Sequence, residues 1–148
     1  MSHLTTSIHA QAGLQRKLVI FASQLEGYLR HFPNCHKYTL TQSIRQAFLD
    51  VYNLVVEAQK RHHKKTTLIA LDVRHEQLRM MINLAHEMGL FAQTGGKSTE
   101  KDIGTHRFLT LSRLVDEIGR MIGGWVQKEL RSDAQQSSGL APVGAVGV

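Results

Sequence analysis

Cysteine, proline and long apolar runs are scarce in this chain of 148 residues, and each scarcity excludes a class of protein. The single cysteine, Cys35, cannot form an internal disulfide, which excludes a disulfide-stapled domain and fits a reducing cytoplasm. Uninterrupted apolar runs are only a few residues long, whereas a helix needs ~20 to cross a bilayer. The first residues, MSHLTTSIHAQAG, lack a charged start followed by an apolar run, so we expect no signal peptide. These features predict a soluble, cytoplasmic protein without a membrane partner.

Proline occurs only at Pro33 and Pro142, which leaves long stretches free to be helical. Apolar residues recur at spacings of three and four, and no segment alternates with a period of two over a useful length. The pattern predicts four amphipathic helices, over residues 13–32, 41–62, 67–88 and 105–131. The early connections are short, which favours antiparallel neighbours. The expected fold is therefore all-α, an antiparallel four-helix bundle.

Each predicted helix has one apolar stripe that we expect to face the core. The stripes comprise Leu14, Leu18, Phe21, Leu25, Tyr28, Leu29 and Phe32; Ile44, Ala47, Phe48, Val51, Leu54, Val55 and Ala58; Leu68, Leu71, Leu78, Ile82, Ala85 and Met88; and Phe108, Leu111, Val115, Ile118, Ile122 and Trp125. Thr39 or Thr41 is expected to cap the second helix by accepting a backbone N–H bond. Gly89 suits a left-handed C-cap of the third helix.

We expect a single domain, because 148 residues can bury ~70% of the unfolded surface without a metal or disulfide. Residues 1–11 are expected to be flexible, and residues 12–131 to form the bundle. Residues 132–148 are too poor in large side chains to pack and are expected to be a disordered tail. The polar, glycine-bearing segment 93–104 between the last two helices is expected to be a mobile surface loop.

Motifs for catalysis or metal binding are weak in this sequence. GGKST (95–99) matches the end of a phosphate-binding loop, but Phe91 stands where that pattern needs glycine, and no strand precedes it. The histidines form no HExxH or inward-facing Glu-x-x-His motif, so we expect no metal. Asp116 and Glu117 are helix neighbours that point in different directions, and Asp116 is expected to pair with Arg120 instead. We therefore expect no enzyme activity and no cofactor.

Positive charge is the strongest chemical signal in the sequence. Eighteen Lys and Arg against 12 Asp and Glu give a formal charge of +6, which favours polyanionic partners such as nucleic acid. Basic residues concentrate where the second helix ends and the third follows, at Lys60, Arg61, Lys64, Lys65, Arg74 and Arg79. An antiparallel hairpin could align them as a basic stripe that holds phosphates without reading base sequence. The alternative is a solvated helix end that happens to be cationic.

Three glycines interrupt the last predicted helix, and each disfavours a helix by ~0.8–1.0 kcal/mol relative to alanine. Gly119 and Gly123 are four apart and lie on one face, where small residues let another helix backbone approach closely. Gly124 and Trp125 then supply a gap beside a large flat ring. The close crossing lies either inside the bundle or between subunits, and we favour an oligomer interface.

Three segments carry motifs that rarely coincide by chance. They are PNCHKYTLTQSIRQAFLDVYNLVVEA (33–58), LRMMINLAHEMGLF (78–91) and LVDEIGRMIGGWVQ (114–127). Over roughly residues 14–130, the chain resembles the accessory variability determinant (Avd) proteins of diversity-generating retroelements. These proteins are related to the four-helix-bundle proteins encoded within ribosomal RNA intervening sequences.

The resemblance implies a four-helix protomer assembled as a ring-shaped homopentamer. Five copies with a formal charge of +6 each would carry +30, enough to concentrate a polyanion. The family motifs carry over to Pro33, Lys37, Tyr38, Arg45, Glu57, Arg79, Asp116, Glu117, Gly119, Arg120, Gly123, Gly124 and Trp125. Most of these are expected to be architectural. The expected contacts to RNA or polymerase are Lys37, Arg45, Arg79 and Arg120.

By the same resemblance, the chain is a bacterial or phage-encoded, non-catalytic accessory protein that supports mutagenic retrohoming. Its implied partners are the element's reverse transcriptase and template-repeat RNA, with cDNA as a further candidate. Two alternatives stay open. One is an intervening-sequence-type bundle protein of unknown role, and the other is a helical assembly module that acts through protein contacts only. Salt-dependent RNA binding separates nucleic-acid binding from the second alternative.

Overall fold

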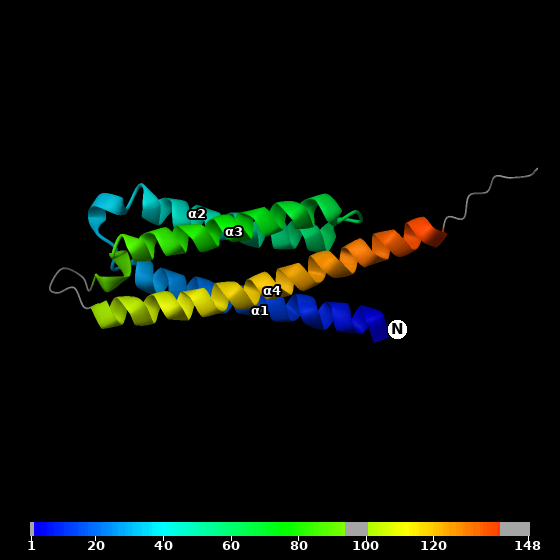
Figure 1. Cartoon of the computed structure of the whole chain (residues 1–148), viewed down its shortest axis with the longest axis horizontal. Helices are drawn as coiled ribbons and strands as arrows, with labels where there is room; N and C mark the ends of the chain where they lie inside the picture. The colour runs from blue at the N-terminus through cyan, green and yellow to red at the C-terminus, as the bar shows by residue number, and fades with distance from the viewer. Residues whose placement is uncertain (1, 94–100, 140–148) are drawn as a thin grey trace, which may run out of the picture.

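The computed structural model describes residues 2–93 and 101–139, and these residues form helices and no strand. The long helices are α1 (Ser2–Leu29), α2 (Leu40–Lys60), α3 (Lys65–Glu87) and α4 (Lys101–Gly139). Two 3-10 turns, η1 (Asn34–His36) and η2 (Leu90–Ala92), lie at one end of the molecule. Successive helices run in opposite directions (Figure 1). The predicted all-α, antiparallel four-helix bundle is confirmed.

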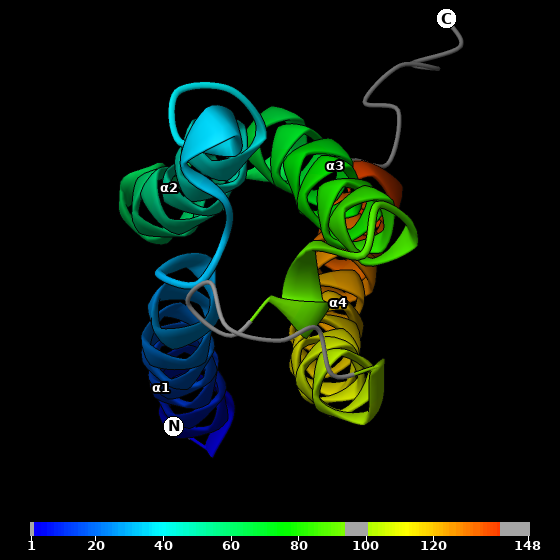
Figure 2. The same ribbon diagram turned by 90° about the vertical axis from the view of Figure 1, so that its left-hand side faces the viewer.

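The four helices surround one core in chain order. Seen along the bundle, each helix lies beside its predecessor and its successor, and α4 closes the circuit next to α1 (Figure 2). The N-terminal part of α1, the α2–α3 turn and the C-terminal half of α4 share one end of the bundle (Figure 1). None of the helices in the described part of the chain has an apolar stretch able to cross a membrane.

The core is built from the predicted stripes with few exceptions. Fully buried side chains from all four helices include Phe21, Ile44, Leu71 and Ile118. Met88 was expected inside but is 46% exposed, because it is the C-cap residue after the last turn of α3. A buried polar residue that periodicity did not predict is His75, at 6% exposure on α3.

The first and last helices of the chain, α1 and α4, are longer than the sequence predicted. The helix α1 begins at Ser2 rather than near residue 13, since residues 2–12 contain neither proline nor glycine to interrupt it. The helix α4 continues past residue 131 to Gly139, and its last residues are exposed. There the hydroxyls of Ser137 and Ser138 donate hydrogen bonds to carbonyls one turn earlier. Residues 140–148 of the predicted tail lie outside the described residues.

The predicted helix caps are partly right. Gly89 follows α3 with φ +74°, the left-handed conformation expected of it. Thr39 is the N-cap residue of α2, but its side chain makes no capping bond, because its hydroxyl donates to the His36 carbonyl instead. Thr41 lies inside α2 and is buried. Neither threonine caps the helix as proposed.

The connection before α4 is shorter than the predicted 93–104 loop, because α4 already begins at Lys101. Gly104 packs so closely on η2 that an added Cβ would lie 3.0 Å from atoms of Ala92. Arg107, which the sequence did not single out, donates to the carbonyls of Phe91 and Gln93 and ties η2 to α4. Residues 94–100, which include GGKST, lie outside the described residues.

Candidate nucleic-acid interface and assembly surfaces

The α2–α3 turn carries the predicted cluster of cations. We call this cluster the basic turn, and it comprises Lys60, Arg61, Lys64 and Lys65. Two of its members have structural partners. Arg61 pairs with Glu57 one turn earlier, at 2.6 Å between Nη2 and Oε1. Lys64 donates to the carbonyls of Ala58 and Gln59, at 2.6 and 3.3 Å, and so satisfies the C-terminal end of α2.

The remaining two cations of the basic turn are available to a ligand. Lys60 and Lys65 are exposed, and neither forms an ion pair within residues 8–93 and 102–139. The neighbouring His62 and His63 rings are also exposed and meet edge to face, with centroids 5.1 Å apart. The turn therefore combines a helix-capping role with two uncommitted ammonium groups.

Arg74 and Arg79 do not extend the basic turn as one stripe. The two residues are five positions apart on α3, which separates them by about 140° around the helix axis. Arg74 is exposed and donates to Gln77 on its own helix. Arg79 forms a two-bond ion pair with Glu76, and the bonds from Arg79 lower the pKa of Glu76 and raise the pKa of Arg79. The prediction of a single aligned stripe is wrong.

Lys37 and Arg45 lie toward the other end of the bundle. Arg45 is ~22 Å from Lys60 along α2, and Lys37 lies before the start of that helix. Lys37 is exposed, with Nζ 5.5 Å from the centroid of the exposed Tyr38 ring. Arg45 forms a two-bond ion pair with Glu26, at 2.6 and 3.2 Å, which joins α2 to α1. The bond to Glu26 raises the pKa of Arg45. Arg45 therefore contributes to the packing of α2 on α1, whereas Lys37 forms no ion pair among the described residues.

Arg120 does not pair with Asp116 as the sequence predicted. Among the ion pairs of residues 8–93 and 102–139, neither residue takes part. Glu117 instead pairs with Lys17 of α1, at 2.6 Å between Nζ and Oε2. This bond from Lys17 is the main cause of a lowered pKa at Glu117. An exposed Asp–Arg pair four apart gains little over hydration, which leaves the Arg120 charge at the surface.

Gly119 is required inside the bundle. The His75 ring of α3 approaches α4 so closely that a Cβ at Gly119 would lie 2.6 Å from His75 Cε1. His75 Nε2 lies 2.7 Å from the carbonyl oxygen of Val115, which can only accept, so Nε2 carries the proton and donates. This buried bond and the missing side chain explain why glycine stands at position 119. For Gly119, the intramolecular alternative left open by the sequence is the one observed.

No comparable contact inside the protomer explains the glycines at positions 123 and 124. A Cβ at either position would meet no atom of the described residues within 4 Å. Gly124 is exposed and lines a pocket, whereas Gly123 is only partly covered. The free-energy cost of glycine in a helix is therefore not offset by packing inside the described protomer at these two positions.

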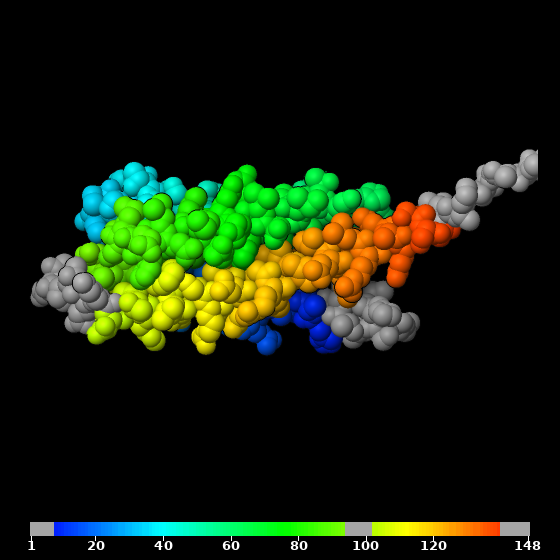
Figure 3. Space-filling view, in the orientation of Figure 1, coloured from blue at the N-terminus to red at the C-terminus, as the bar shows by residue number. Residues whose placement is uncertain are grey.

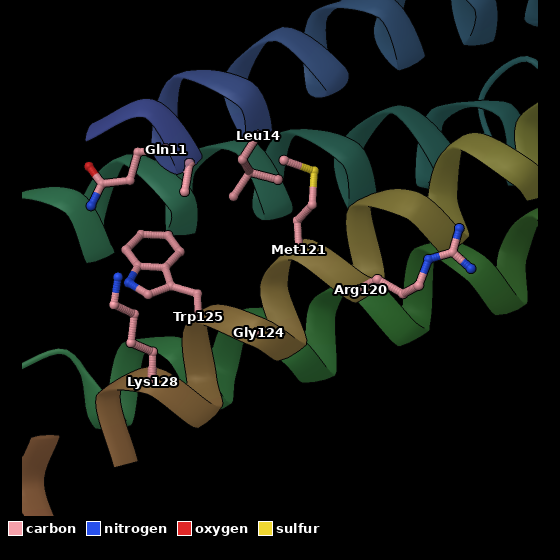
Figure 4. Close-up of a pocket in the computed structure, with 8 residues that line it drawn as sticks. Gln11, Leu14, Arg120, Met121, Gly124, Trp125 and Lys128 are labelled. Atoms are coloured by element: carbon pink, nitrogen blue, oxygen red, sulfur yellow. The ribbon is translucent and has the colours of Figure 1, made fainter. Parts of the chain in front are cut away.

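Trp125 forms one wall of a cavity between α1 and α4. The cavity has a volume of about 220 Å³ and is lined by Ala10, Gln11, Leu14, Arg120, Met121, Gly124, Trp125 and Lys128. In Figure 4, the indole lies between the two helices, with Gln11 and Leu14 on the α1 side and Met121 beside it. The Lys128 side chain runs toward the indole, while the Arg120 guanidinium points away along α4 (Figure 4). Sequence reasoning missed Lys128, although it lies one helical turn after Trp125.

An apolar stripe runs along the exposed face of α3. We call it the α3 stripe, and it comprises Ile69, Val73, Met80 and Leu84, each about half exposed. These positions are separated by four, seven and four residues, so they share one helix face. Figure 3 shows α3, in green, at the surface along its length. Exposed apolar side chains gathered on one face are typical of a protein–protein contact.

No group of three or more histidine, cysteine or carboxylate side chains gathers into a metal-binding arrangement within the described residues. Cys35 is exposed and has its thiol free. The prominent features of the described surface are therefore its cations, its apolar stripe and the Trp125 cavity.

Comparison with known proteins adds one finding. The family model described as bAvd-like matches residues 13–129, which is most of the chain. No curated protein and no solved structure shows a significant match. The matched range includes the whole of α2 and α3, together with the parts of α1 and α4 that contribute to the core.

Proposed function

The chain belongs to the bAvd-like family, and on that premise we propose that it is a non-catalytic accessory protein of a diversity-generating retroelement. In this proposal, a basic homo-oligomer binds the element's reverse transcriptase and its template-repeat RNA, and so supports mutagenic retrohoming. The observation that carries the nucleic-acid part is exposed positive charge without a carboxylate partner, at Lys60 and Lys65 of the basic turn.

The arrangement of these cations suits phosphate binding. Lys60 ends α2 and Lys65 begins α3, so the two lysines flank the same turn of the hairpin. Lysines of this kind neutralise phosphates and release counterions, but they carry no sequence information. The proposed role is therefore to hold RNA by its backbone, while the polymerase performs the chemistry.

Self-association would increase the number of cations available to bind one RNA. Two features support an oligomer: the α3 stripe, which is apolar and exposed, and Gly123, whose missing side chain serves no contact in the protomer. We propose the ring-shaped pentamer that the family resemblance implies. Five copies, each with a formal charge of +6, would bring +30 onto one particle.

Salt-dependent RNA binding tests the proposal. The affinity of the full chain for a fluorescently labelled RNA should fall linearly with the logarithm of salt concentration, with a slope of about −0.7 per phosphate contact for single strands. The double variant Lys60→Gln/Lys65→Gln should bind more weakly and with a shallower slope. Lys64 is left intact, because its replacement would also remove the cap of α2.

A matched control removes equal charge elsewhere. Arg16 and Arg30 are exposed on and just after α1, and neither forms an ion pair among the described residues. The variant Arg16→Gln/Arg30→Gln should therefore weaken binding less than the lysine variant. Equal losses would mean that only net charge matters, and the basic turn would be a solvated helix end.

The α3 stripe keeps a second candidate function open, a helical assembly module that acts through protein contacts only. This candidate predicts an oligomer of normal size that fails to bind RNA even at low ionic strength. Such a result would refute the proposed function, but it would not affect the fold or the family membership.

A further inference from the structure

The Trp125 cavity is lined mainly by aromatic and apolar side chains. Its walls are the indole, the Met121 thioether and the Leu14 side chain, and its floor is open because Gly124 has no side chain. Its volume of about 220 Å³ is below the ~300–1,000 Å³ typical of pockets for drug-sized ligands. The space therefore suits one flat ring rather than a large ligand.

Cations flank this aromatic cavity. Arg120 and Lys128 line it, both are exposed, and neither forms an ion pair among the described residues. The nearby Glu117 carboxylate is already paired with Lys17. The rim is thus net positive, while the interior is apolar.

We infer that the Trp125 cavity binds one unpaired base of single-stranded RNA, stacked against the indole, with the adjoining phosphate held by Lys128. Aromatic stacking combined with a positive groove is how proteins bind single strands without sequence preference. This inference rests on the proposed function and deepens it, because it assigns RNA a second point of attachment. The basic turn lies toward the same end of the bundle, so one strand could reach both (Figure 1).

Charge argues against a second copy of the chain as the occupant. In a ring of copies, the contact would set this positive rim against another surface of a chain whose formal charge is +6, and like charges repel. A polyanion removes that repulsion. Duplex RNA is a poorer fit than a single strand, because its bases are already stacked and paired.

The experiment uses Trp125 as its own probe, since it is the only tryptophan in the chain. The full chain is titrated with a single-stranded oligoadenylate, and in parallel with an abasic oligonucleotide of equal length and charge. We expect the oligoadenylate to quench the tryptophan emission to saturation and the abasic strand to leave it unchanged. Ring stacking should also give the oligoadenylate about tenfold higher affinity than the abasic strand.

Substitutions at Trp125 and Lys128 distinguish a loss of base stacking from a general loss of RNA binding caused by misfolding. Measured by anisotropy of a labelled strand, Trp125→Leu should lose about tenfold in affinity for oligoadenylate but bind the abasic strand as the native chain does. Trp125→Phe, which keeps a ring, should recover part of that loss. Lys128→Gln should weaken binding of both strands, because it contacts phosphate rather than base.

Three results would overturn the inference, and they differ in what they leave standing. Salt-dependent RNA binding with unchanged tryptophan emission and a fully active Trp125→Leu variant would remove the base site but keep the proposed function. Emission that changes with protein concentration in the absence of RNA would assign the cavity to a second copy. Absence of all RNA binding at low salt would remove the proposed function itself.

Discussion

Gly119 and Gly123 look alike in the sequence, yet the structure gives them opposite roles. At Gly119, the His75 ring occupies the space that a side chain would need. At Gly123, the same space is empty. A glycine in a helix therefore identifies a position without a side chain, and the neighbouring helix decides whether that position matters for folding.

Alanine substitution at the two glycines should change the free energy of unfolding in opposite directions. Gly119→Ala gains up to ~1 kcal/mol of helix propensity but forces the buried His75 ring away from Val115, so we expect net destabilisation of ~1–3 kcal/mol. Gly123→Ala meets nothing within 4 Å and should stabilise the protomer by ~0.5–1 kcal/mol. Urea denaturation followed by circular dichroism measures both changes. A stabilised Gly119→Ala variant would show that His75 can move aside without loss.

At the scale of the element, two ion pairs tie α1 to its neighbours. Glu26 binds Arg45 of α2, and Lys17 binds Glu117 of α4. Packing places α1 between these two helices. The two ion pairs therefore help to fix its rotation about its own axis, since each connects a different side of α1.

The Lys17–Glu117 pair predicts a pH dependence. The bond from Lys17 lowers the pKa of Glu117 below its ordinary value of 4.5, so the pair stabilises the fold at and above that value. The contribution disappears as pH falls through the lower pKa of the folded state, where the carboxylate becomes protonated. Lys17→Met should therefore reduce the melting temperature at neutral pH, and the difference from the native chain should vanish in strong acid.

Arg16→Met is the matched control for that experiment, because Arg16 is the exposed neighbour of Lys17 and forms no ion pair among the described residues. Its melting temperature should track that of the native chain across the pH range. A Lys17→Met deficit that persists unchanged at low pH would mean that Lys17 acts through packing of its aliphatic chain rather than through the ion pair.

At the scale of the whole molecule, the exposed apolar side chains are unevenly distributed. Four follow one face of α3 as the α3 stripe, and a smaller group with lower exposure lies on α2 at Leu49, Tyr52 and Val56. On α4, Leu109 lies far along the helix from Leu130, the other exposed one. Single exposed apolar residues are normal on a protein surface, but a continuous stripe indicates a contact surface. The stripe is therefore where we expect copies of the chain to meet.

A charge placed on the stripe should prevent assembly. Leu84→Glu is expected to lower the particle mass measured by multi-angle light scattering while leaving the helical circular dichroism intact, because Leu84 is about half exposed. Leu109→Glu introduces the same charge at a comparably exposed position outside the stripe and should leave the mass unchanged. If both variants keep the native mass, the α3 stripe is not the contact surface.

Gly123→Leu probes a second surface of the same assembly. The protomer has room for the added side chain, so a fall in particle mass would place Gly123 at a contact between copies. An unchanged mass would exclude Gly123 from the interface.

The sequence by itself determined the helices, their buried stripes and the family. These are local properties: apolar spacing of three and four sets which face of a helix is buried, and motif residues lie close together in the chain. The errors were at the helix ends, where α1 and α4 continue beyond their packed segments. The spacing of apolar residues carries no information there, because the extra turns of α4 bury nothing.

Only the tertiary structure decided which charged and small residues are already committed to the fold. The pairs Glu26–Arg45, Lys17–Glu117 and His75–Gly119 join residues far apart in the sequence. Such contacts depend on how each helix is rotated and how closely it approaches its neighbour, and the spacing of residues along one helix does not contain that information. For the same reason, the cavity beside Trp125 became visible only when α1 was placed against α4.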